Sequence, residues 1–238
     1  MATPRLFRLK SQLAPAPEGP VATELPYARI YVDTGVFHLD TPYDYEVPEK
    51  FSEIVKTGVR VQVPFGNREV EGLVIERVVA PSVISGFKSI TKVLSHQLVA
   101  TPKSLELIAQ TAQRWATNPW DVIRSAIPPR VAAVDKAFAP TALRSARSSN
   151  QSDVCFRAFE PHISAHGQVA SIALDSIRKG SVLIVAPDER DIIAICAHLQ
   201  ASSAPVVRID SGLSRNDRYA NFLQSMQEQH QIVIGSRS

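Results

Sequence analysis

The 238-residue chain lacks several features that define common protein classes. Its two cysteines, Cys155 and Cys196, can build neither a disulfide framework nor a paired-cysteine metal site, and two reduced thiols fit a cytoplasmic protein. No apolar run approaches the roughly 20 residues that span a bilayer. The first 20 residues hold no signal-peptide core of about 7–15 apolar residues. We therefore expect a cytoplasmic protein with no membrane partner.

A strong charge of one sign is also missing. Lys and Arg number 26 against 23 Asp and Glu, so the formal net charge is only +3. Residues 103–150 carry seven basic and three acidic residues, whereas the other regions are close to balanced. This local excess favours an anionic partner only weakly, and a solvated basic linker explains it equally well. The hydrophobic content of 45% is that of a globular protein with one large or two small domains.

Catalytic motifs are the third absence. The sequence contains no GxSxG, HExxH or GxGxxG pattern and no GxxxxGK[ST] phosphate loop. Residues 160–168, which precede a predicted helix at 168–179, have one glycine and no lysine, whereas a triphosphate loop requires both. His162 and His166 have no third metal ligand in view. We predict no catalytic residue, no metal site and no cofactor for this chain.

Hydrophobic periodicity divides the chain into five regions. Residues 1–26 hold five of the 17 prolines and are expected to form a disordered leader. Residues 27–100 alternate polar and apolar residues in about five short strands, which is typical of a small barrel or sandwich. Residues 101–130 are expected to be a helical extension, 131–152 a linker, and 153–238 a parallel α/β region with about three strands. Because a doubly wound domain normally continues further, the chain is interpreted as a fragment or a decayed gene product.

Two burial predictions accompany this division. Trp115 falls on one helical face with Leu105, Ile108 and Ala112, so Trp115 and Trp120 are expected to be core anchors rather than platforms for stacked bases. Residues 181–187 form a continuous apolar run, which predicts a strand buried on both faces.

An ordered set of short motifs resembles the N-terminal part of primosomal protein N′, the replication-restart helicase family PriA, in its high-GC Gram-positive (actinobacterial) form. In the β region the matching landmarks are Tyr43-Asp44-Tyr45 with Val47-Pro48, Gly58-Val59-Arg60-Val61, Val63-Pro64-Phe65-Gly66, Gly72-Leu73-Val74, and Phe87-Lys88 ahead of Val93-Leu94. In the second half, residues 181–189, 210–214 and 232–238 are similar to segments of that family's first helicase lobe. The resemblance covers roughly residues 27–238.

The resemblance implies a fold and a binding site. The fold would be a small β-barrel-like DNA-binding domain with a helical extension, followed by an incomplete helicase-like α/β lobe. The family's pocket for the 3′ end of the nascent strand would lie at Tyr43, Asp44, Gly66 and Lys88. Taken alone, the same residues could be a core aromatic, the polar side of a strand, a hairpin turn and a surface cation.

The chain also departs from the family pattern. The phosphate loop is absent, and so are the later Asp-Glu-x-His box and the cysteine-rich zinc segment, so we expect none of the family's ATP, magnesium and zinc cofactors in this chain. We therefore expect a DNA-binding replication-restart protein that recognises forked DNA or a single-stranded 3′ end, with primosome proteins and single-stranded-DNA-binding protein as further partners. Alternatives are a fragment of an active ATP-dependent 3′-to-5′ helicase and an interaction module with no nucleic-acid role.

Overall fold

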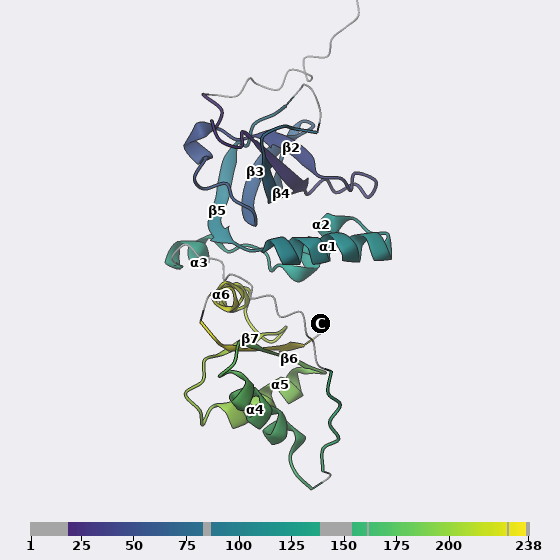
Figure 1. Ribbon diagram of the computed structural model, residues 1–238, viewed down its shortest axis with the longest axis vertical. Helices are drawn as coiled ribbons and strands as arrows, with labels where there is room; N and C mark the ends of the chain where they lie inside the picture. Colours follow the sequence, from purple (N-terminus) through teal and green to yellow (C-terminus); the bar gives the residue numbers. More distant parts are fainter. Residues whose placement is uncertain (1–18, 83–86, 139–153, 161, 228, 237–238) are drawn as a thin grey trace, which may run out of the picture. The chain divides into compact units, whose positions relative to one another are not determined.

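The computed structural model describes residues 19–82, 87–138, 154–160, 162–227 and 229–236. It divides into two compact units, unit 1 (Met1–Ile127) and unit 2 (Pro128–Ser238), each treated by itself below (Figure 1). Within the described ranges no helix combines the length and the apolar character that a membrane crossing requires.

Unit 1 is built on a five-stranded antiparallel sheet with the order β2-β1-β4-β3-β5. The alternation seen in the sequence produces it, because Ala28, Ile30 and Val32 of β1 are at most 4% exposed, and the valines of β3 are fully buried. The strands are β1 (Tyr27–Val32), β2 (Tyr43–Glu46), β3 (Val59–Phe65), β4 (Arg68–Val78) and β5 (Lys92–Leu98), with a short 3-10 helix, η2 (Glu49–Phe51), after β2.

The sheet curls without closing. β2 and β5 are its two edges, and among the described residues they do not pair with each other. The segment just before β5 lies between them, since Glu46 exchanges main-chain hydrogen bonds with Lys88 and Ile90 while Thr91 donates to Gln62 of β3. The mixed α+β class is confirmed, but the structure contains no closed barrel in the part that it describes.

Residues 19–26 lie in the stretch expected to be a disordered leader, yet they pack on the sheet. Ala22 is 3% exposed and donates its main-chain N–H to Val47 at 2.8 Å. The Arg77 guanidinium donates to the carbonyls of Glu24 and Leu25 and also to those of Ser52 and Val55. One arginine therefore ties this segment to unit 1, a long-range contact that local composition does not reveal. Residues 1–18 lie outside the described residues.

Two helices complete unit 1: α1 (Pro102–Trp115) and α2 (Pro119–Ala126). Thr101 caps α1, because its hydroxyl accepts from the main-chain N–H of Ser104. Trp120 is 8% exposed, which confirms it as a core residue. The prediction for Trp115 is wrong, because its side chain is 74% exposed. It is the last residue of α1, immediately before the chain turns at the left-handed Ala116.

Unit 2 has a three-stranded parallel sheet with the order β6-β8-β7, as the strand–helix alternation predicts. In Figure 1, α4 and α5 lie on one side of this sheet and α6 on the other. The elements are α3 (Ala132–Ala137), α4 (Ala165–Ser176), β6 (Val182–Ala186), α5 (Glu189–Leu199), β7 (Val206–Ile209), α6 (Arg215–Ser225) and β8 (Ile232–Ser236).

Two predictions for unit 2 differ from the structure. Part of the expected linker forms α3, whose buried Asp135 accepts a hydrogen bond from the Tyr219 hydroxyl at 2.6 Å; residues 139–153 lie outside the described residues. In the part of the chain that the structure describes, strand β6 is buried on one face only, because Leu183 and Val185 are 72% and 64% exposed. Helices α4 and α5 cover the face that carries Ile184, and α6 packs against β7 instead.

Candidate nucleic-acid interface

The four residues singled out from the sequence line one pocket of unit 1. Tyr43 and Asp44 begin β2, Gly66 lies in the turn between β3 and β4, and Lys88 precedes β5. The pocket has a volume of about 430 Å³, which is within the ~300–1,000 Å³ of small-molecule sites. Its other lining residues are Thr41, Pro42, Tyr45, Pro64, Phe65, Ser82 and Phe87.

Aromatic rings form much of the pocket wall. The half-buried Tyr43 packs edge-on against Phe65, with ring centroids 5.2 Å apart. On another part of the wall Phe87 packs against Tyr27 at 5.0 Å. Burial raises the pKa of Tyr45, whose hydroxyl donates to the Pro64 carbonyl at 3.3 Å, so this phenol stays neutral. The wall offers flat apolar surface of the kind on which a nucleobase can stack.

Gly66 and Lys88 belong to the same side of the pocket. The Lys88 ammonium donates to the Gly66 carbonyl at 3.2 Å and is otherwise exposed. Gly66 has a φ of +59°, a left-handed conformation that glycine adopts without strain. A Cβ atom built on it would meet nothing within 4 Å. The turn therefore places the main chain of Gly66, without a side chain, next to the Lys88 ammonium at the edge of the pocket.

Asp44 differs from the other three because its side chain is buried, with an exposed fraction of 1%. Its Oδ1 atom accepts from Arg29 Nε at 3.3 Å, and its Oδ2 atom accepts from the main-chain N–H of Ser82. The sequence alone indicated either a pocket carboxylate or the polar side of a strand at this position. The structure places it beneath Ser82, with Arg29 as a partner that the motif comparison did not single out.

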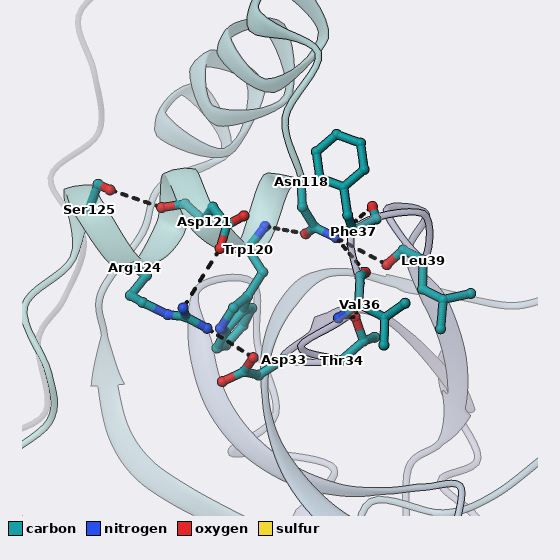
Figure 2. Close-up of polar contacts among 10 residues, drawn as sticks. All are labelled: Asp33, Thr34, Val36, Phe37, Leu39, Asn118, Trp120, Asp121, Arg124 and Ser125. Atoms are coloured by element: carbon teal, nitrogen blue, oxygen red, sulfur yellow. Dashed lines mark hydrogen bonds and ion pairs between the residues drawn. The ribbon is translucent and has the colours of Figure 1, made fainter.

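The helical extension fixes the loop that leads into the pocket. Figure 2 shows the side chain of Asn118, the N-cap of α2, directed at the loop that joins β1 to β2. Its Nδ2 atom lies 3.3–3.4 Å from the carbonyl oxygens of Val36, Phe37 and Leu39, while its Oδ1 atom accepts from Trp120.

A second attachment lies beside the first. Arg124 of α2 pairs with Asp33 at the start of the loop, with 3.0 Å between Nη2 and Oδ1 (Figure 2). The far end of the same loop supplies Thr41 and Pro42 to the pocket. These anchors join residues about 80–90 positions apart, so no local motif predicts them. The one signal in the sequence was that Asn118 precedes a helix at a position typical of a capping residue.

No group of three or more His, Cys, Asp and Glu side chains gathers around a possible metal position in the described parts of the chain. The predicted absence of a cofactor stays a prediction.

Comparison with known proteins gives the same family as the motifs. Residues 29–128 match the family model of the PriA 3′ DNA-binding domain. The chain is 29% identical over 226 residues to the probable replication restart protein PriA of Mycobacterium tuberculosis H37Rv, covering 84% of this chain and 34% of that protein. The Mycobacterium leprae protein of the same name is 28% identical over 232 residues, covering 84% of this chain and 35% of that protein.

A shorter match links the chain to a more distant organism. The replication restart protein PriA of Bacillus subtilis is 42% identical over 48 residues, which is 20% of this chain and 6% of that protein. The chain spans about a third of the length of the mycobacterial relatives. The family match covers every residue that lines the pocket, and the mycobacterial similarity covers more of the chain than unit 1 alone. Residues 29–128 thus match the PriA 3′ DNA-binding domain, and most of the chain is similar to part of the PriA proteins of mycobacteria.

Proposed function

We propose that unit 1 binds the 3′ end of a DNA strand and that the chain acts in replication restart by recognising the nascent strand at a stalled fork. One observation carries the proposal: Tyr43, Asp44, Gly66 and Lys88 come from three separate stretches of sequence and line a single pocket. The match of residues 29–128 to a 3′ DNA-binding domain supports the same assignment.

Each lining group has a chemical role in this proposal. The ring of Tyr43, which packs edge-on against Phe65, stacks on the terminal base, an interaction worth about 1–3 kcal/mol in such sites. The Asp44 carboxylate accepts a hydrogen bond from the terminal 3′-hydroxyl and repels a phosphate at the same position. Gly66 leaves room for the nucleotide, and Lys88 pairs with a backbone phosphate.

The test is fluorescence anisotropy with the 238-residue chain and two forks that differ only at the strand end. A fork that ends in a 3′-hydroxyl at the branch is expected to bind about tenfold or more tightly than the same fork with a 3′-phosphate, because a hydrogen bond to a charged group contributes about 1.5–3 kcal/mol. Asp44→Asn removes the charge at nearly constant shape and should bring the ratio towards one. Equal affinities for both forks, unchanged in the variant, would refute the proposal.

Unit 2 is proposed to be part of a helicase-like lobe that does not hydrolyse ATP in this chain. Its three parallel strands with flanking helices support the first part. The start of α4, where a phosphate loop would lie, is occupied by the chain's own groups. The Ser164 hydroxyl accepts from the Gly167 main-chain N–H, and His166 lies 2.7 Å from the Asp191 carboxylate. Calorimetry with Mg-ATP should detect no binding, and a stoichiometric heat signal would favour an active helicase instead.

The remaining roles extend the proposal to the cell. From its similarity to PriA proteins we propose that the chain works in the cytoplasm and meets primosome proteins and single-stranded-DNA-binding protein at the fork. A pull-down with those proteins, in the presence and absence of forked DNA, tests this part separately from the pocket.

A further inference from the structure

The carboxylate proposed to read the strand end is already engaged on both oxygen atoms. Arg29 Nε donates to Asp44 Oδ1 at 3.3 Å, and the Ser82 main-chain N–H donates to Asp44 Oδ2. A carboxylate has about four lone-pair positions, so two hydrogen bonds do not saturate it. Access is the limiting factor, because the Asp44 side chain is only 1% exposed. A hydroxyl that arrives from the pocket must therefore displace one of the two donors.

Arg29 is the harder of the two to move, because its position follows from the sheet register. Arg29 faces Asp44 across the β1–β2 pair and Glu76 across the β1–β4 pair. Its guanidinium lies between both carboxylates, with Nη1 2.6 Å from Glu76 Oε1. Directly opposite residues of opposite charge stabilise such pairs. The three side chains together carry a charge of −1, which is unfavourable for an approaching phosphate.

Ser82 is held much less firmly. It follows the end of β4 outside any regular element and is exposed. The contacts described for it are the N–H bond to Asp44 and a 3.2 Å hydrogen bond from Arg29 Nη2 to its hydroxyl. Its N–H is a single donor aimed at Oδ2, which is also what a terminal hydroxyl would supply. An ionised phosphate has acceptor oxygens and no donor, so it cannot take this place.

We infer, building on the proposed function, that strand-end recognition is an exchange of hydrogen bonds on Asp44. The main-chain N–H of Ser82 holds the Oδ2 position that the 3′-hydroxyl takes over. Arg29 acts as the positioning residue that keeps the carboxylate in place while the donors exchange. Discrimination between a hydroxyl end and a phosphate end then depends on Ser82 and Arg29 as well as on Asp44.

The Ser82 part is tested with two matched substitutions in the full chain. Ser82→Pro removes the competing N–H, whereas Ser82→Ala keeps it and removes only the hydroxyl. Forks with a 3′-hydroxyl should bind several-fold more tightly to Ser82→Pro than to Ser82→Ala, because only the proline variant lacks the N–H that competes for the carboxylate. A hydrogen bond to a charged group corresponds to about a tenfold difference in affinity. Equal affinities of the two variants would overturn the exchange.

The outcome for the unmodified chain separates this inference from the proposed function. An unmodified chain that does not distinguish hydroxyl from phosphate ends overturns the proposed function itself. If the unmodified chain distinguishes the two ends but Ser82→Pro and Ser82→Ala bind the 3′-hydroxyl fork equally, only the exchange is overturned. If Ser82→Pro does not fold, amide hydrogen exchange of the unmodified chain decides. Protection of the Ser82 N–H should fall with a 3′-hydroxyl oligonucleotide and stay unchanged with a 3′-phosphate one, and unchanged protection in both would refute the exchange.

The Arg29 part has its own measurement. Arg29→Gln should lower the ratio of hydroxyl-end to phosphate-end affinity about tenfold, because the carboxylate loses its fixed orientation. Arg29→Lys, which keeps the charge, should restore part of the ratio. A purely structural role would weaken binding to both forks equally, so an unchanged ratio in Arg29→Gln would remove Arg29 from the recognition step.

Discussion

Replacement of Lys88 by alanine provides a quantitative test of the phosphate contact. The ammonium of Lys88 is exposed, and its described contact is a hydrogen bond to the neutral carbonyl of Gly66 at 3.2 Å. A phosphate that enters the pocket can therefore meet this charge without first breaking an ion pair. One lysine that neutralises one phosphate of a single strand contributes about 0.7 to the slope of log K against log salt.

That slope converts directly into an affinity difference. Between 50 and 200 mM salt the affinity ratio of unmodified chain to Lys88→Ala should shrink about 2.5-fold. The assay is fluorescence anisotropy with a 3′-hydroxyl oligonucleotide at four or more salt concentrations. Lys92→Ala is the matched control, because Lys92 is an exposed lysine in β5 that does not line the pocket. Identical slopes for both variants would show that Lys88 makes no phosphate contact.

Two further predictions concern the fold around the pocket. Gly58→Ala should destabilise unit 1 by several kcal/mol in chemical denaturation, since its Cβ would lie 2.1 Å from the Ala100 carbonyl oxygen at a φ of +86°. Gly66→Ala should cost only about 1 kcal/mol, because the position has a left-handed φ but open space, and a larger loss than for Gly58→Ala would contradict this ranking. The raised pKa of Tyr45 means that the folded state holds the phenol proton more tightly than the unfolded state. The contribution of this group to the free energy of unfolding is therefore fully present below about pH 10 and is lost as the pH rises above it. Tyr45→Phe should therefore flatten the alkaline part of the stability curve, and an equally steep decline in this variant would refute the assignment.

The sequence predicts the architecture of unit 1 well because its strands are local patterns. Ile30 and Val61 lie on the buried face as their alternation requires, and both are fully buried. The four pocket positions also share one pocket, which a family resemblance can indicate because the motifs keep their order along the chain.

The contacts of the Asp44 carboxylate could not be predicted in the same way. Arg29 and Ser82 reach it through strand pairing and a chain reversal, at separations of 15 and 38 residues. The pairing register places Arg29 opposite Asp44, whereas Ser82 reaches the carboxylate from the segment after β4, and no short pattern encodes either contact. For the same reason the burial of Asp44 was invisible in a strand that alternates normally.

Unit 2 shows the limit of composition as a guide. A continuous apolar strand indicates burial on both faces only when helices cover both faces, and the exposure of Leu183 shows that one face of β6 is not covered within the described residues. Part of the stretch expected to be a linker forms α3, and Asp135 of this helix accepts a buried hydrogen bond from Tyr219, 84 positions away. Both differences arise from tertiary contacts rather than from local preference.

The most direct measurement places the strand end itself. A fork whose 3′-terminal base is 5-iodouracil is irradiated with the chain, and the cross-linked peptide is located by mass spectrometry. The account predicts a cross-link to an aromatic residue of the pocket, namely Tyr43, Phe65 or Phe87, and its loss when the same base is moved several nucleotides inward. Cross-links that map elsewhere in unit 1, or to unit 2, for the terminal base would contradict it.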